Sequence, residues 1–281
     1  MVRSLWTGAS GMIAQQQNVD TIANNLANVS TRGYKTEKAE FKSLLYQTLQ
    51  TRSTNNAGEE KPISAQVGLG TRTASITSQF TQGNLIDDDS PFAIGIEGEG
   101  FFKVRTNTGA IQYTRDGNFA ISQVAGGNLL CTGDGEPILD INNERIVIPF
   151  REDNNDPNSP IYNPSDIYID KDGRMSISIN GGQSRDLGMQ IGMVQFANPA
   201  GLEKVSSNKY IETVASGAPM EEATNVGLTK SRMHQYYLEA SNVQVSQEMV
   251  NLIVAQRAYE MNSKIIQASD TMLEQANNLR R

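Results

Sequence analysis

Apolar residues recur at helical spacing at both ends of the chain, and in short strand-like runs between them. Near the C-terminus, one stripe of apolar side chains repeats every seven positions: Val245, Leu252, Tyr259, Ile266 and Leu273. A helix with one apolar face and one polar face has this pattern. It predicts a C-terminal helix within residues 231–281, with Ser241 or Asn242 as the cap at its start.

A matching stripe lies at the other end of the chain, at Leu5, Met12, Val19 and Leu26. It predicts an N-terminal helical segment within residues 1–35. Two such helices are expected to form an antiparallel coiled-coil-like pair. Ordinary packing of two helices in one globular domain explains the same periodicity. Both stripes are wide, however, and a single pair leaves part of each uncovered, which favours self-assembly with the nine residues of the two stripes as the polymer interface.

The middle of the chain has a different pattern. Residues 36–66 are mostly polar and are predicted to be a linker or an extended arm. Its part 46–66 either connects passively or bridges neighbouring subunits and stiffens their assembly. Residues 67–230 contain short strand-like runs separated by turn signals and predict a β-rich domain. Asp-Gly pairs at 116–117, 134–135 and 172–173 predict turns within it. The predicted fold class is α+β, with a discontinuous helical domain made from both termini and a central β-rich domain.

Charge is distributed unevenly along the 281 residues, whose formal net charge is −7. The first fifty residues carry +2 and residues 241–281 are neutral, so the acidic excess lies in the middle. This balance argues against nucleic acid as a partner. The chain has no apolar run long enough to span a membrane and no pattern typical of a signal peptide, so export by the general secretory route is not expected.

Candidate catalytic and ligand-binding motifs are weak. GIEGEG (95–100) precedes a strand-like FFKVRT rather than a helix, so it predicts a turn and not a phosphate loop. His234 is the only histidine and Cys131 the only cysteine, which excludes multi-histidine metal sites and an internal disulfide. Solvated charge explains the acidic run Asp87–Asp89. We therefore expect no enzyme, no metal and no cofactor.

The termini also carry a specific resemblance. NVDTIANNLANVSTRGYK (18–35) and the segment 241–279 resemble the two terminal signatures of the bacterial flagellar axial proteins, the rod and hook family. EGEGFFKV (97–104) and YTRDGNF (113–119) are similar to motifs of the family's central β-domain. Within the family, the greatest similarity is to members that build the distal rod, and it lies in four short motifs: FKSLLYQTLQ (41–50), QVGLG (66–70), QGNL (82–85) and ANNLRR (276–281).

The resemblance implies a structural subunit of the flagellar basal body that polymerises into a rigid tubular drive shaft across the periplasm and transmits motor torque to the hook. It implies several partners: copies of itself, proximal rod and hook subunits, the outer ring proteins around the rod, and the type III flagellar export apparatus. Departures from the family pattern at 90–100 and 151–166 affect expected surface contacts. The alternatives are a hook or proximal rod protein, or a secreted β-rich binding protein with a coiled-coil oligomerisation stalk.

Overall fold

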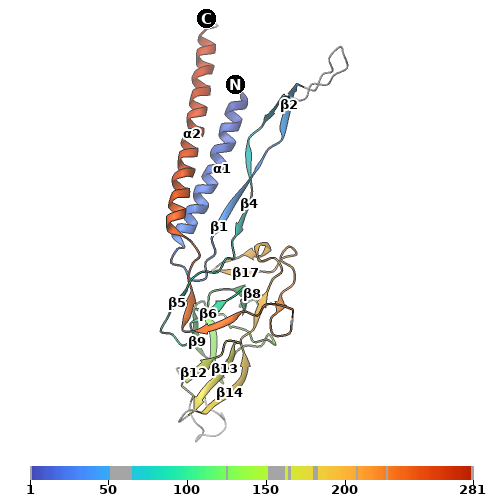
Figure 1. Cartoon of the computed structure of the whole chain (residues 1–281), viewed down its shortest axis with the longest axis vertical. Coiled ribbons are helices and arrows are strands. Elements are labelled where there is room, and N and C mark those ends of the chain that lie inside the picture. Colours follow the sequence, from blue (N-terminus) through green and yellow to red (C-terminus); the bar gives the residue numbers. More distant parts are fainter. Residues whose placement is uncertain are drawn as a thin grey trace, which may run out of the picture. The chain divides into compact units, whose positions relative to one another are not determined.

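The structure is a computed structural model that describes residues 2–50, 65–124, 126–150, 162–163, 166–179, 183–206, 208–225 and 227–279 (Figure 1). The chain forms two compact units. The first consists of residues 1–27, 37–79 and 244–281, and the second of residues 28–36 and 80–243. The structure thus divides the chain differently from the predicted segments, because strands on both sides of residue 66 belong to the first unit.

Two helices dominate the first unit. Helix α1 spans Val2–Ala27 and helix α2 spans Val245–Asn278 (Figure 1). Helices at both termini and a β-rich middle confirm the predicted α+β class. The prediction that Ser241 or Asn242 caps α2 is wrong, because Gln244 precedes the helix and makes no side-chain cap. The Asn242 side chain instead accepts a hydrogen bond from the Thr36 backbone N–H at 2.7 Å. Among the described residues, no helix is long and apolar enough to cross a membrane.

The first unit also contains two antiparallel strand pairs. Their strands are β1 (Glu37–Ser43) with β4 (Thr71–Ser78), and β2 (Tyr46–Gln50) with β3 (Ala65–Gly68). The described part of the predicted linker 36–66 is therefore largely strand. Sequence reading missed β1 because Ala39 is its single buried residue, so it lacks the alternation that marks a half-buried strand. Residues 51–64, which hold most of the possible bridging arm 46–66, lie outside the described residues.

The second unit is β-rich, as predicted. Its strands are β5 (Leu85–Asp87), β6 (Ile94–Glu97), β7 (Phe101–Arg105), β8 (Ile111–Thr114), β9 (Phe119–Val124), β10 (Gly127–Thr132), β11 (Val147–Pro149), β12 (Ile167–Ile169), β13 (Arg174–Ile179), β14 (Gln183–Gln190), β15 (Met193–Gln195), β16 (Glu203–Lys204), β17 (Lys209–Ile211), β18 (Met220–Glu221), β19 (Arg232–Gln235) and β20 (Tyr237–Glu239), and a 3-10 helix, η2, spans Pro199–Gly201. The largest sheet has the strand order β16-β17-β8-β7-β15-β18. Strands β19 and β20 fall within 231–281, so that predicted helical segment is helical only from Val245.

Turns in this unit follow the Asp-Gly signals in part. Gly135 and Gly173 have positive φ angles of 81° and 80°, and each closes a turn with a backbone hydrogen bond of 2.8 Å. The pair at 116–117 joins β8 to β9, which are not paired with each other, so it is not a hairpin. The second half of GIEGEG, residues 98–100, forms the predicted turn between β6 and β7, whereas its first half belongs to β6.

Strand β7 separates two hydrophobic clusters. Successive side chains in a strand point to opposite faces. Phe102 therefore packs in the larger cluster, with its ring 4.9 Å from that of Phe119. Phe101 packs in the smaller one, 5.7 Å from the ring of Phe196. The two adjacent phenylalanines are both almost completely buried and anchor β7 from both sides.

A buried ionic cluster joins distant parts of the second unit. Glu239 accepts contacts from Lys35 Nζ at 2.7 Å and from Arg115 Nε at 2.9 Å, and all three side chains are at most 1 % exposed. The Gly83 backbone N–H also donates to this carboxylate, and Lys35 donates to the Thr81 carbonyl. Burial, together with the nearby Arg115 charge, lowers the pKa of Lys35 from 10.5 to about 8, although Glu239 raises it. The cluster therefore links Lys35, between α1 and β1, to Arg115 directly after β8 and to Glu239 at the end of β20.

Candidate assembly interface

Helices α1 and α2 pack side by side in antiparallel orientation (Figure 1). Ser4 near the start of α1 lies against Ser269 near the end of α2, with 3.0 Å between the two hydroxyl oxygens. At the other end of the pair, Asn25 donates to Glu248 at 3.3 Å. We call the contact between these two helices the seam.

Glycines let the two helices approach closely in the seam. A Cβ atom added to Gly8 would lie 3.0 Å from Cγ1 of Ile266. A Cβ atom added to Gly11 would lie 2.8 Å from Nδ2 of Asn262. Contacts this short do not leave room for a larger side chain unless the facing side chains or the helices themselves move. The seam is therefore built on small residues.

The residues predicted from the heptad stripes are only partly covered. Leu5, Met12, Val19, Leu26, Leu252, Ile266 and Leu273 are half-buried. Val245 and Tyr259 remain 40 % and 42 % exposed. The structure brings Ile266 onto Gly8 in the seam, and it brings Val19 and Tyr259 together in a groove beside it. In the part of the chain that the structure describes, the two stripes thus remain partly exposed.

Other apolar side chains of the helix pair are exposed to a greater degree. On α1, Trp6 is 72 % and Ile13 is 60 % exposed. On α2 the exposed apolar residues are Met249, Val250, Ile253, Val254, Met261, Ile265 and Met272. A soluble monomer rarely leaves so many large apolar residues uncovered on two adjacent helices, and such surfaces mark contacts with other molecules.

Sequence reading missed the residues that form the seam itself. Seven-residue spacing relates Glu248, Ala255, Asn262 and Ser269 on α2, and multiples of seven relate Ser4, Gly11 and Asn25 on α1. These stripes of small and polar residues run beside the apolar ones. The signal that could have revealed the seam residues is the presence of glycines within α1. Glycine lowers the stability of a helix, so a glycine inside a helix indicates that a close contact requires it.

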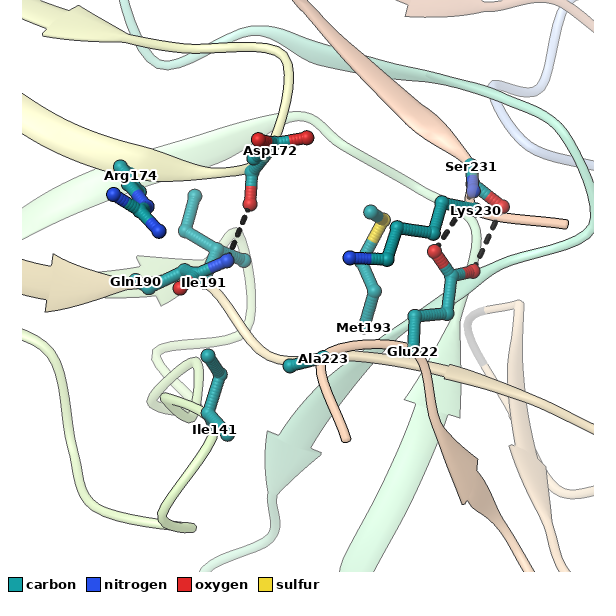
Figure 2. Close-up of a pocket in the computed structure, with 10 residues that line it drawn as sticks. All are labelled: Ile141, Asp172, Arg174, Gln190, Ile191, Met193, Glu222, Ala223, Lys230 and Ser231. Atoms are coloured by element: carbon teal, nitrogen blue, oxygen red, sulfur yellow. Dashed lines mark hydrogen bonds between the residues drawn. The ribbon is translucent and has the colours of Figure 1, made fainter. Parts of the chain in front are cut away.

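A pocket in the second unit has mixed chemistry (Figure 2). Arg174 and Lys230 direct their cationic groups toward its open centre, and Asp172 and Glu222 lie at its sides. Glu222 is 4 % exposed and accepts hydrogen bonds from the Ser231 backbone N–H, the Ser231 hydroxyl and the Gln195 amide, each at 2.8 Å. These bonds hold two segments of backbone together, which is a structural role.

The two remaining candidate groups, Cys131 and His234, also have surroundings that indicate a structural role. Cys131 is a buried free cysteine, and burial raises the pKa of its thiol. His234 lies 2.8 Å from the Glu97 carboxylate, and this hydrogen bond is the main cause that lowers the pKa of Glu97. Within the described ranges, no group of three or more His, Cys, Asp or Glu side chains could hold a metal ion.

Three family models match the chain in sequence order. The model described as flagella basal body rod protein matches residues 5–35, which contain most of α1. The flagellar hook protein FlgE/F/G D1 domain matches residues 95–177 of the second unit. The C-terminal model of the flagellar basal body rod FlgEFG proteins matches residues 234–279, which contain α2. Both helices of the seam are thus family features.

Relatives extend this similarity to the whole chain. The flagellar basal-body rod protein FlgG of Borreliella burgdorferi is 43 % identical over 287 residues, covering 100 % of both chains. FlgG of Buchnera aphidicola from Acyrthosiphon pisum is 41 % identical over 281 residues, 99 % of this chain and 100 % of the relative. FlgG of Bacillus subtilis is 36 % identical over 281 residues and 100 % of both chains. The chain therefore belongs to the flagellar rod and hook family, in its FlgG group of basal-body rod proteins.

Proposed function

We propose how this chain performs the task of its family. It is a structural subunit of the distal rod of the flagellar basal body. Copies of the chain assemble into a rigid tubular shaft that crosses the periplasm and transmits motor torque to the hook. The observation that carries the mechanism is the row of large apolar side chains that the helix pair leaves exposed on α1 and α2.

The exposed apolar residues support contacts between copies. Burying apolar surface contributes about 25 cal/mol per Å², so several side chains of this size supply a substantial driving force for association. We propose that the heptad stripes make coiled-coil-like contacts with neighbouring copies, because the seam inside one chain is built mainly on small residues and includes the stripe residue Ile266 at Gly8. The interface would include the predicted residues Leu5, Met12, Val19, Leu26, Val245, Leu252, Tyr259, Ile266 and Leu273.

Further partners follow from a shaft of this kind. We propose that proximal rod and hook subunits contact its two ends, that ring proteins surround it, and that the flagellar export apparatus delivers the chain. We propose that this role is structural and involves no catalysis or cofactor. In support, the buried carboxylates Glu222 and Glu239 bind backbone and side-chain groups of the fold itself.

Replacing one exposed apolar residue of α2 tests the assembly role. Val254 is 62 % exposed, so a Val254→Asp chain should fold, but in the polymer its charge would be buried without a partner at a cost of several kcal/mol. We expect cells with this variant to lack distal rods in electron micrographs of basal bodies. The matched control is Val214→Asp in the second unit, where the valine is fully exposed, and this variant should assemble. Normal rods from Val254→Asp would contradict the proposal.

A further inference from the structure

The Asn25 side chain occupies a junction of three elements of the first unit. It is 1 % exposed, near the end of α1. Its amide nitrogen donates to the Glu37 carbonyl at 2.8 Å, and its amide oxygen accepts from the Glu37 N–H at 2.9 Å. The amide therefore pairs with the first residue of β1 as a neighbouring strand would. This two-point contact fixes the end of α1 relative to β1.

The same amide nitrogen also contacts α2. It donates to Oε2 of Glu248 at 3.3 Å, and the Asn251 side chain donates to Oε1 at 3.4 Å. Glu248 is 8 % exposed and lies in the first turn of α2, where the helix dipole favours a negative charge. No Lys or Arg of the described residues forms an ion pair with it. Because a buried carboxylate needs its hydrogen bonds, moving Glu248 away from Asn25 carries a penalty.

The rest of the seam defines the alignment of the two helices only weakly, because a slip of seven residues would bring another bulky residue, Tyr259 or Leu273, onto Gly8 in place of Ile266. Its small residues recur at seven-residue spacing on both helices, so a slip of α2 by seven residues again places small residues against small residues.

The pair formed by Asn25 and Glu248 repeats in only one direction, because a slip toward the start of α1 places Glu248 against Asn18, seven residues before Asn25. In that slip Asn25, whose amide pairs with Glu37, loses its partner on α2. After such a slip, Asn25 would face Ala255 or Ser241 instead of a carboxylate. A single buried asparagine has the same effect in coiled coils, where it specifies register at some cost in stability.

We propose that Asn25 is the residue that sets the register of α1 against α2, through its bond to Glu248 while Glu37 holds it in place. The register itself rests on the fold alone. Its consequence for assembly rests on the proposed function: identical register in every copy places the exposed apolar residues of α2 at the same height, as contacts between identical subunits require.

Disulfide trapping in the full-length chain tests this inference. The background is Cys131→Ser, which removes the native thiol, with Ser4→Cys and Ser269→Cys to report the observed register. Two further pairs, Ser4→Cys with Asn262→Cys and Ser4→Cys with Ala276→Cys, report slips of seven residues in either direction. Under mild oxidation, the parent chain should form the first cross-link and little of the other two, because Ser4 and Ser269 are already in contact.

In the Asn25→Leu variant, the first cross-link should fall at least about tenfold relative to the slipped cross-links, the effect of losing a hydrogen bond to a charged group. Glu248→Leu should do the same from the other helix. The matched control is Asn24→Ala, whose side chain is exposed and bonds to the Glu37 carboxylate. An unchanged cross-linking pattern in Asn25→Leu and Glu248→Leu would overturn the proposal. Loss of the helical circular dichroism signal in Asn25→Leu would also overturn the proposal, because Asn25 would then be needed for the helices to form and not for their register.

Discussion

At the scale of single residues, the most informative groups are polar side chains that the fold buries. Lys35, Arg115 and Glu239 form an ionic cluster in the second unit, and Asn25 and Glu248 form a hydrogen-bonded pair in the first. Buried polar groups are costly unless all partners are present, so each cluster specifies one arrangement of the segments that supply it. The two clusters therefore fix the segment that follows α1 and the segment that precedes α2.

The lowered pKa of Lys35 predicts how stability depends on pH. Its pKa is 10.5 in the unfolded chain and about 8 in the folded chain, so between these values the unfolded state binds more protons. The free energy of unfolding should therefore rise as pH increases from 8 toward 10.5, by up to about 1.4 kcal/mol per pH unit from this group. Chemical denaturation at pH 7.5, 9 and 10 measures this slope. Subtracting the slope measured for Lys35→Met from that of the parent chain isolates the contribution of Lys35. Equal slopes in both chains would show that Lys35 does not titrate in this range.

At the scale of elements, the helix pair combines a close seam of small residues with apolar stripes beside it. In a two-stranded coiled coil the apolar heptad positions fill the contact between the helices. Here Gly8 and Gly11 occupy that contact, and the apolar residues extend to the sides. A pair built in this way retains exposed apolar surface that can pack against further helices. This suits a subunit that is surrounded by copies of itself.

Enlarging a seam glycine tests the close approach. Valine has a higher helix propensity than glycine by a few tenths of a kcal/mol, so Gly11→Val would stabilise an unpaired helix. In the observed seam it should instead cost about 1–3 kcal/mol, because the new side chain would overlap Asn262. Thermal melting of the full chain followed by far-ultraviolet circular dichroism should show a lower midpoint. Thr7→Val, on the exposed side of α1, is the control, and a raised midpoint for Gly11→Val would show that the helices are not in contact there.

At the scale of the whole molecule, sequence periodicity was sufficient for the two terminal helices and the β-rich middle. It failed where pairing is non-local: β1 pairs with β4 about thirty residues later, and both are largely exposed. Periodicity also predicted that apolar residues fill the seam, because Leu and Ile dominate a hydrophobic pattern. Gly, Ser and Asn contribute nothing to such a pattern. The contacts of Asn25 and Glu248, which are more than two hundred residues apart, could not be inferred from spacing.

We propose that the exposed apolar face of α2 contacts other copies of the chain in the rod. Photo-crosslinking from a benzoyl-phenylalanine at position 253, where Ile253 is 57 % exposed, measures this contact directly in flagellated cells. After irradiation and isolation of basal bodies, we expect covalent adducts of two or more copies of this chain. Efficient incorporation into rods with no adduct between copies from position 253 would contradict the claim.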